Sequence, residues 1–298
     1  MGADRKTVVY SGIGQPDRSF ITDRPGLETV RSRIVSDIRS TVEDASAEGA
    51  VVAMSGGIDS TVTAALAVEA LGSDRVLGLG LPCHKAEQTG VSEARTIAEG
   101  LGIEFEEIQL RPILEAFEGT VVESLESDTI EDDEDRPHER THATGNVIAR
   151  LRMICAYYAA NRQRRLVLGT ANRSEWLLGY FTKYGDGAAD TYPIGDLYKM
   201  EVRALAKRIG VPKRIVSKEP TAGFWADQTD ADELGAPYDV IDPLLQRLVE
   251  LNEPIGDAAD ALGIDRETAR SIAWLCAETK HKRTTPPTPG IAGRTDGS

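Results

Sequence analysis

The sequence predicts an α/β fold, in which flanking helices cover a doubly wound, mostly parallel sheet. Strand-like apolar runs alternate with helix-patterned segments as far as residue 168. A glycine loop joins the first of these strands to its helix, and another glycine turn follows the fourth strand. Because successive short βα units build parallel sheets, we expect ligands at the carboxyl ends of the strands, where both turns lie.

Each strand is expected where a short apolar run is bounded by polar or glycine residues. These runs cover residues 51–54, 76–81, 104–109 and 166–168. Between them, helical periodicity predicts helices at 60–71, 87–101, 113–123 and 146–162, and an amphipathic helix at 29–47 precedes the first strand. Further helices are expected at 199–209, 244–251, 255–262 and 265–276, the last three resembling a helical cap on the sheet.

The chain is expected to form one main domain. Its 298 residues show neither an internal repeat nor a clear linker. We place this domain at residues 25–287, after an N-terminal extension (1–24) and before a tail (288–298) whose Pro, Gly and Thr content predicts mobility.

Composition excludes several classes of protein. With 48 acidic against 34 basic residues, the net charge is -14, which disfavours a nucleic-acid partner. No apolar run approaches the ~20 residues of a membrane span, and the N-terminus lacks the apolar core of a secretory signal, so we expect a cytoplasmic protein without a membrane partner. Its three cysteines are widely spaced, which argues against a zinc ribbon or a disulfide framework.

The loop after the first strand has the composition of a pyrophosphate site. Residues 55–60 read Ser-Gly-Gly-Ile-Asp-Ser and lie between a strand and a helix. Glycines let backbone N–H groups approach phosphate oxygens, serine hydroxyls donate hydrogen bonds, and the helix N-terminus adds partial positive charge. Asp59 would repel phosphate unless a divalent cation lay between them, which identifies it as a candidate Mg²⁺ ligand. No Walker lysine follows the glycines.

A second polar group follows the fourth strand. It runs through residues 168–175, 179–190 and 193–199, with glycines placed between charged side chains. This pattern indicates backbone that lies close to a ligand. Glu175, on the turn after the strand, is a candidate second oxygen ligand for Mg²⁺. Taken singly, Lys183, Asp190 and Lys199 would be interpreted as solvated charges.

Together, five segments resemble a known family. The loop at 55–60 is similar to the SGGxDS loop of the N-type ATP pyrophosphatases. Residues 145–153 (GNVIARLRM), 168–199 (with GTANRSE and FTKYGDG), 218–235 (with PTAGFW and QTD) and 281–287 (with HKR) are similar, in the same order, to segments of ammonia-dependent NAD synthetases. The chain is therefore identified as a member of that family, over about residues 25–287.

The resemblance implies a fold and a reaction. The fold is Rossmann-like, of the adenine nucleotide α-hydrolase type. The reaction is the ATP-dependent amidation of deamido-NAD (nicotinate adenine dinucleotide) with ammonia, through an adenylate, giving NAD, AMP and pyrophosphate. Mg²⁺ is the implied cofactor and a homodimer the implied assembly. Because the segment before Ser55 is too short for a minimal domain of ~50 residues together with a linker to the first strand, we expect free ammonia rather than a fused glutaminase as nitrogen donor.

Residue roles follow from the same resemblance. Asp59, Lys199 and Asp190 are the expected catalytic residues, Lys199 as charge neutraliser and Asp190 as a group near ammonium. The expected ATP-binding residues are Ser55, Gly56, Gly57, Ile58, Asp59, Ser60, Thr170, Lys199 and Thr221. The expected deamido-NAD-binding residues are Arg150, Lys183, Asp190, His281 and Lys282. The expected metal ligands are Asp59 and Glu175. Arg152, two positions along the helix from Arg150, is expected to form a surface ion pair.

Two alternatives remain open on sequence alone. Another ATP pyrophosphatase, such as a tRNA thiolase or a GMP synthetase, would share the loop, although a thiolase would favour catalytic cysteines and a basic RNA-binding surface. The second alternative is a regulatory module that binds ATP without turnover, although paired metal carboxylates and a lysine favour catalysis.

We hypothesise that the acidic surface is an adaptation to salt, although an ordinary soluble acidic protein explains the charge equally well. Hydrated carboxylates hold water, and salt screens their mutual repulsion. On this hypothesis the initial rate of NAD formation is retained when KCl is raised to molar concentration. Loss of activity over that range would contradict it.

Overall fold

A four-stranded parallel sheet forms the centre of the protein. In this computed structural model, which describes residues 20–126, 137–219 and 229–287, the strand order is β3-β2-β1-β4. The strands are β1 (Gly49–Ala53), β2 (Val76–Gly80), β3 (Glu104–Glu107) and β4 (Arg165–Leu168), all paired in parallel. The predicted parallel sheet is confirmed. The predicted mobile tail lies outside the described residues.

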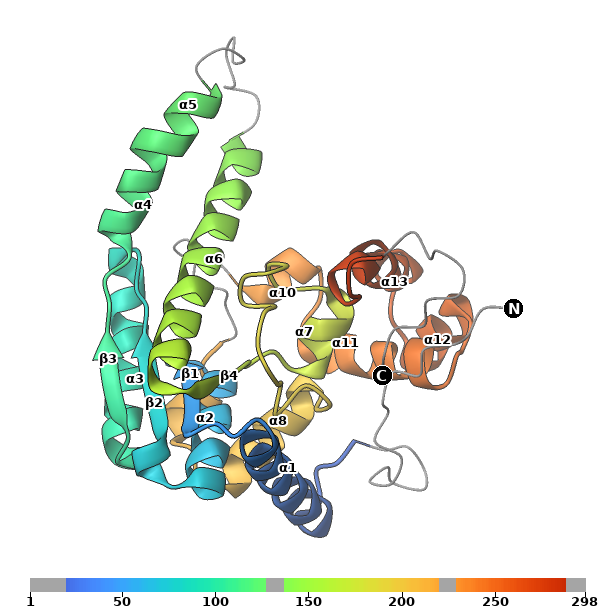
Figure 1. The fold of residues 1–298 in the computed structure, drawn as a ribbon. Coiled ribbons are helices and arrows are strands. Elements are labelled where there is room, and N and C mark those ends of the chain that lie inside the picture. Colours follow the sequence, from blue (N-terminus) through green and yellow to red (C-terminus); the bar gives the residue numbers. More distant parts are fainter. Residues whose placement is uncertain (1–19, 127–136, 220–228, 288–298) are drawn as a thin grey trace, which may run out of the picture.

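Helices cover both faces of the sheet (Figure 1). On one face α1 (Arg24–Asp44), α2 (Ile58–Leu71), α3 (Gln88–Leu101) and α8 (Lys199–Arg208) share one buried core with alternate residues of β1. On the other face α4 (Arg111–Phe117) and α6 (Pro137–Gln163) form a second core. Val51 belongs to that second core, whereas its neighbours Ala50 and Val52 belong to the first, as the pleat of a strand buried on both sides requires.

Two helical rods extend beyond the sheet (Figure 1). The first is α4, which continues through the π-helical turn η3 (Glu118–Val122) into α5 (Glu123–Glu126). The second, α6, has 27 residues and begins nine positions before the predicted start at residue 146. The sequence of these extra turns has no apolar period, so periodicity did not predict them.

A separate group of helices packs beside the sheet. It contains α7 (Arg173–Leu178), α10 (Asp230–Leu234), α11 (Tyr238–Leu245), α12 (Ile255–Leu262) and α13 (Arg266–Glu278), with their own buried cluster. The predicted helices at 255–262 and 265–276 are confirmed. The one predicted at 244–251 begins earlier, at Tyr238, and ends in the π-helical turn η5 (Gln246–Glu250).

The shortest elements were not predicted. They include α7, α9 (Lys213–Val216), α10 and the 3₁₀ turns η1 (Ser73–Arg75), η2 (Lys85–Glu87) and η6 (Thr279–Lys282). Helices of one or two turns show too few residues for a periodic pattern. Among the described helices, none has the length and apolar character needed to cross a membrane.

Candidate active site

The loop between β1 and α2 is closed by its own polar groups. The Gly57 N–H donates to Ser55 Oγ at 3.3 Å, and the Ser60 hydroxyl donates to the Gly57 carbonyl at 3.2 Å. Ser60 Oγ also accepts from the Ser55 N–H at 3.3 Å. Ile58, expected as a loop residue, is the first residue of α2, with Gly57 as its N-cap. The serine hydroxyls and the helix N-terminus therefore lie together, as a phosphate site needs.

Gly56 brings this loop against the next helix. Its φ of +75° is unfavourable for any residue with a Cβ, and a Cβ there would lie 2.1 Å from the carbonyl oxygen of Gly90. Conversely, a Cβ at Gly90 would lie 2.6 Å from the carbonyl oxygen of Ser55. The backbones of the loop and α3 are therefore in close contact at Gly56 and Gly90, where neither residue has a Cβ. Sequence reasoning missed Gly90, because nothing in its own segment marks the contact.

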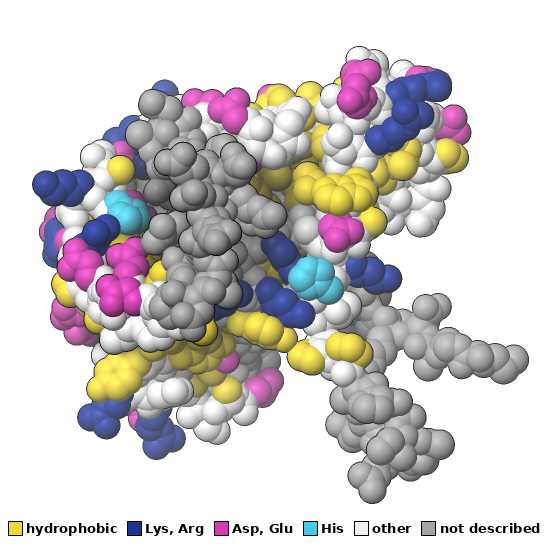
Figure 2. All heavy atoms as spheres, turned by 90° about the horizontal axis from the view of Figure 1, so that it is seen from above, with side chains coloured by type: hydrophobic (Ala, Val, Ile, Leu, Met, Phe, Trp, Pro, Cys, Tyr) yellow, Lys and Arg dark blue, Asp and Glu magenta, His cyan; other side chains and the backbone are white. Residues whose placement is uncertain are grey.

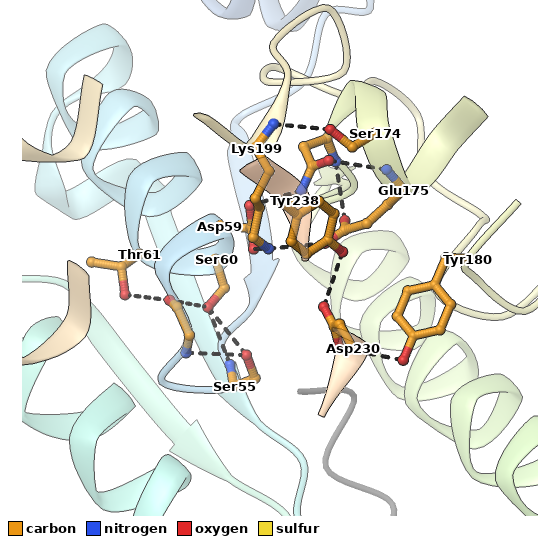
Figure 3. A network of polar contacts seen from close by, with 12 residues as sticks. Ser55, Asp59, Ser60, Thr61, Ser174, Glu175, Tyr180, Lys199, Asp230 and Tyr238 are labelled. Carbon is orange, nitrogen blue, oxygen red and sulfur yellow. Dashed lines mark hydrogen bonds and ion pairs between the residues drawn. The ribbon is translucent and has the colours of Figure 1, made fainter. Parts of the chain in front are cut away.

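Three predicted residues meet at one ammonium group (Figure 3). Lys199 Nζ donates to Asp59 Oδ2 at 2.6 Å and to Glu175 Oε1 at 3.0 Å. Each side chain comes from the first turn of a helix: α2, α7 and α8. Residues separated by up to 140 positions in the chain therefore form one charged cluster. The lysine side chain is only 3% exposed.

Asn172 fixes the two carboxylates relative to one another. Its Nδ2 donates to Asp59 Oδ1 at 3.1 Å, while its Oδ1 accepts from the Glu175 N–H at 3.0 Å. The Asn172 N–H in turn donates to Glu175 Oε2 at 3.2 Å, which completes a capping box at the start of α7. The sequence analysis gave Asn172 no role. The signal in the sequence was an Asn three residues before a Glu, in the short turn that follows a strand.

Burial and ion pairing set the charges of the cluster. Burial alone would lower the pKa of Lys199, but the carboxylates of Asp59 and Glu175 outweigh it and raise that pKa above the ordinary value. Burial, together with Asp59, raises the pKa of Glu175 although Lys199 opposes the change. The lysine is thus held as a cation, and one cation does not fully compensate two buried carboxylates.

The donor set suits Mg²⁺. Asp59 and Glu175 each place a carboxylate oxygen within hydrogen-bond distance of the same nitrogen, so these oxygens converge. Mg²⁺ prefers such hard oxygen ligands and is commonly held by one or two carboxylates together with substrate phosphates. Across the described ranges, no group of three or more metal-binding side chains occurs. The residues present therefore fit a metal that arrives with a phosphate ligand.

Four of the five predicted deamido-NAD residues form a second group. Arg150 on α6 donates to the Lys183 carbonyl at 3.2 Å, and Lys183 Nζ donates to the His281 carbonyl at 2.8 Å. Lys282 Nζ donates to the carbonyls of Gly179 at 2.7 Å and Phe181 at 2.9 Å. Burial lowers the pKa of Lys282. In Figure 2, Lys and Arg side chains and a histidine gather near the middle of the face seen from above.

Asp190, the fifth of these residues, lies beside the edge strand β4. Its Oδ2 accepts from the Val167 N–H at 2.7 Å, and its Oδ1 accepts from the Tyr157 hydroxyl at 3.3 Å. Burial, and next the Asp190 charge, raises the pKa of Tyr157 to about 12, so this phenol remains a donor. Asp190 itself is exposed, although one of its carboxylate oxygens accepts the backbone bond from Val167. Thr170 follows β4 and is half-buried, whereas Thr221 lies outside the described residues.

Arg152 departs from the sequence prediction of a surface pair. It forms an ion pair with Glu87 in which the two side chains are only 24% and 13% exposed, and its Nε donates to the Leu81 carbonyl at 3.1 Å. Glu87 also accepts from the Cys83 N–H at 2.6 Å. Burial would raise the pKa of Glu87, but Arg152 and the amide donors hold it below the ordinary value. The pair thus anchors the loop after β2 to α6.

The chain is similar to known proteins over most of its length. The family model of NAD synthase matches residues 30–286. The chain belongs to the NAD synthase family. Curated relatives include the NH(3)-dependent NAD(+) synthetase of Thermococcus kodakarensis, 43% identical over 263 residues that cover 88% of this chain and 96% of the relative. That of Halobacterium salinarum is 44% identical over 259 residues, which cover 87% and 92%.

Solved structures agree with the family fold. The NMN synthetase from Francisella tularensis has a TM-score of 0.75 and 34% identity, and the match covers 89% of this chain and 99% of that one. The NH3-dependent NAD synthetase from Campylobacter jejuni has a TM-score of 0.70 and 27% identity, covering 88% and 98%. The fold expected from the sequence, of the adenine nucleotide α-hydrolase type, is confirmed.

Replacing Gly56 by alanine should destabilise this NAD synthase family member. A positive φ costs a non-glycine residue about 1–3 kcal/mol, and the added Cβ also meets the Gly90 carbonyl. We expect a lower free energy of unfolding in urea and weaker ATP binding. Gly57→Ala is the matched control, because Gly57 has a φ of −86°. Equal stability of the two variants would contradict the prediction.

Proposed function

We propose that this protein amidates deamido-NAD with ammonia at the expense of ATP, producing NAD, AMP and pyrophosphate. One observation carries the proposal: the Lys199 ammonium lies 2.6 Å from Asp59 and 3.0 Å from Glu175, and Asp59 follows directly on the loop that carries the glycines. The curated relatives at 43–44% identity are named NH(3)-dependent NAD(+) synthetases, which supports the same chemistry here.

In the first step, the nicotinate carboxylate attacks the α-phosphorus of ATP. A P–O bond forms, the bond to the β-phosphate oxygen breaks, and pyrophosphate leaves with additional negative charge. The Gly57 N–H, the Ser55 and Ser60 hydroxyls and the N-terminus of α2 stabilise the departing phosphates. Lys199 neutralises the charge that develops in the transition state, which is where an interaction accelerates the reaction.

In the second step, ammonia attacks the carbonyl carbon of the acyl adenylate. AMP is the leaving group, and the nitrogen loses a proton as the amide forms. A free carboxylate resists this attack because oxide would have to leave, so the adenylate is the necessary intermediate. We propose that Asp190 lies close to the ammonium ion that supplies the nitrogen. Its exposed carboxylate would attract this ion or take its proton.

Mg²⁺ is part of the proposal, with Asp59 and Glu175 as its protein ligands. When bound, the ion supplies Lewis-acid neutralisation of the phosphate oxygens. The chain's own contribution is to hold both carboxylates in place through Asn172. The ATP candidates Thr170 and Thr221 complete the proposed nucleotide site.

The second group of cations is the proposed deamido-NAD site. Arg150, Lys183, His281 and Lys282 come from α6, the segment after α7, and η6, and they are linked through backbone carbonyls. A dinucleotide carries two phosphates, which such cations attract. Glu175 lies in the first turn of α7, and Lys282 donates to the carbonyl of Gly179, the C-cap of the same helix, so α7 links the two groups. We place this activity in the cytoplasm, where the three free cysteines would persist.

The test is a coupled assay with purified protein, ATP, Mg²⁺ and ammonium. With deamido-NAD, pyrophosphate, AMP and NAD should form in equal amounts, and chelation of Mg²⁺ should stop all three. Nicotinate mononucleotide is the comparison substrate, because a structural relative is titled NMN synthetase. Release of inorganic phosphate in place of pyrophosphate would contradict the proposal, and faster conversion of the mononucleotide would overturn the choice of substrate.

The proposed assembly is a homodimer through the two helical rods. Five apolar side chains are exposed there, between 37% and 73%: Ile113, Val121, Leu125, Ile154 and Tyr158. They lie on α4, η3, α5 and α6, which run beside one another away from the sheet (Figure 1). Apolar surface gathered on one part of a protein commonly marks an interaction site, and a second copy offers a surface of the same character.

Charges placed on α6 should dissociate this dimer. The double variant Ile154→Asp/Tyr158→Asp puts two carboxylates on one helix face, four residues apart, where apolar contact is expected. By light scattering, the unmodified protein should have about twice the 32.2 kDa mass of one chain, and the variant should have the mass of one chain. Trp274→Asp on α13, with 61% exposure, is the control that should stay dimeric. A monomeric unmodified protein would rule the assembly out.

A further inference from the structure

Tyr238 is a buried tyrosine beside the lysine of the nucleotide site, and none of the sequence motifs includes it. It is the first residue of α11 and is 3% exposed. The centroid of its ring lies 5.2 Å from Lys199 Nζ. Figure 3 shows it together with the lysine and the lysine's two carboxylate partners.

The ring limits where the ammonium can go. A lysine ammonium is carried on a flexible four-carbon chain, so two hydrogen bonds alone leave it several arrangements. Asp59 and Glu175 supply those two bonds. The aromatic face of Tyr238 attracts a cation and offers it no competing acceptor. It also occupies space into which the lysine chain would otherwise rotate.

The ring is itself held by a buried carboxylate. The Tyr238 hydroxyl donates to Asp230 Oδ2 at 2.9 Å, and the Tyr180 hydroxyl donates to Asp230 Oδ1 at 3.3 Å. Asp230 is 4% exposed, so its oxygens need hydrogen-bond donors within the protein. The Tyr180 hydroxyl has one proton, which Asp230 shares with Glu233 on the same helix, α10, so Tyr238 is the firmer of the two donors. Burial raises the pKa of Tyr238 far above its ordinary value, which keeps its hydroxyl protonated and donating.

We propose that Tyr238 is a positioning residue, whose ring, fixed through Asp230, holds the Lys199 ammonium against Asp59 and Glu175. The inference rests on the proposed function, in which that ammonium neutralises the departing pyrophosphate. Without the ring, the lysine samples more rotamers, and Nζ spends less time where charge develops. The loss acts on the transition state more than on bound ATP, so kcat falls more than KM for ATP rises.

The first experiment compares two variants in the full chain. Tyr238→Leu removes the ring, and Tyr238→Phe keeps the ring but removes its bond to Asp230. For deamido-NAD-dependent pyrophosphate release, we expect Tyr238→Leu to lower kcat about 10-fold or more while KM for ATP changes less than about threefold. The kcat of Tyr238→Phe should lie between that of Tyr238→Leu and that of the unmodified protein. A Tyr238→Leu variant with unchanged kcat overturns the proposal.

Leu245→Ala is the matched control. Leu245 is fully buried, lies two turns from Tyr238 on α11 and belongs to the same buried cluster, but its side chain offers no aromatic face to the Lys199 ammonium. Both Tyr238→Leu and Leu245→Ala should lower the melting temperature, but only Tyr238→Leu should lower kcat. Equal loss of kcat in both would show a purely structural effect and overturn the proposal.

A double-mutant cycle tests whether Tyr238 acts through the lysine. In a Lys199→Met background, Tyr238→Leu should cause no further loss of the residual rate, because the group that it positions is already gone. Full additivity of the two losses would overturn the proposal. A structural role of Tyr238 would give that additivity.

An NMR measurement separates this inference from the proposed function. The face of an aromatic ring shifts nearby protons upfield, so the Lys199 Cε protons, assigned with Lys199→Met, should resonate upfield in the unmodified protein and return toward the ordinary position in Tyr238→Leu. No such difference overturns the inference even if the enzyme is active. Absence of deamido-NAD-dependent pyrophosphate from the unmodified protein overturns the proposed function and leaves this measurement to decide the inference.

Discussion

The pairing of one buried ammonium with two carboxylates is the constraint on which the active site depends. The Lys199 side chain is 3% exposed and contacts Asp59 and Glu175, which are 17% and 16% exposed, so the buried ammonium depends on these two carboxylates. This requirement brings together the first turns of α2, α7 and α8. The strands, the loop and the helices around the cluster can be understood as the frame that holds those three turns in contact.

Part of that frame is a buried carboxylate on a fourth helix. Asp242 of α11 accepts from the Ser174 hydroxyl at 2.6 Å and from the Met200 N–H at 2.9 Å, and Ser174 in turn accepts from the Lys199 N–H at 2.9 Å. Asp242 is fully buried, and desolvation raises its pKa to about 6. These hydrogen bonds connect α7, α8 and α11 at the start of α8, which is where Lys199 lies. The helical group beside the sheet thereby orients the nucleotide site on the sheet.

The charged cluster around Lys199 and the proposed deamido-NAD group are joined by a short helix rather than by a long loop. Glu175 lies in the first turn of α7, and the Gly179 carbonyl at its other end accepts from Lys282. On the opposite side, Arg150 and Arg152 of α6 reach in two directions, to the Lys183 carbonyl and to Glu87 in the loop after β2. On the proposed function, α6 and α7 would hold the two groups of residues in a fixed arrangement, which suits a reaction between two bound substrates.

The sequence by itself determined the parallel sheet, the glycine loop and the identity of the charged cluster. Apolar runs, helical periodicity and the residue types of local motifs are properties of short segments, and they do not depend on distant contacts. Asp59, Glu175 and Lys199 were recognisable because each lies in such a motif. Only the tertiary structure decided that Gly56 packs on Gly90, that Asn172 fixes both carboxylates, that Arg152 is half-buried against Glu87, and that Tyr238 faces the ammonium. These contacts join residues far apart in the chain, and their partners are chosen by packing and by the need of buried polar groups for hydrogen bonds, neither of which leaves a local pattern.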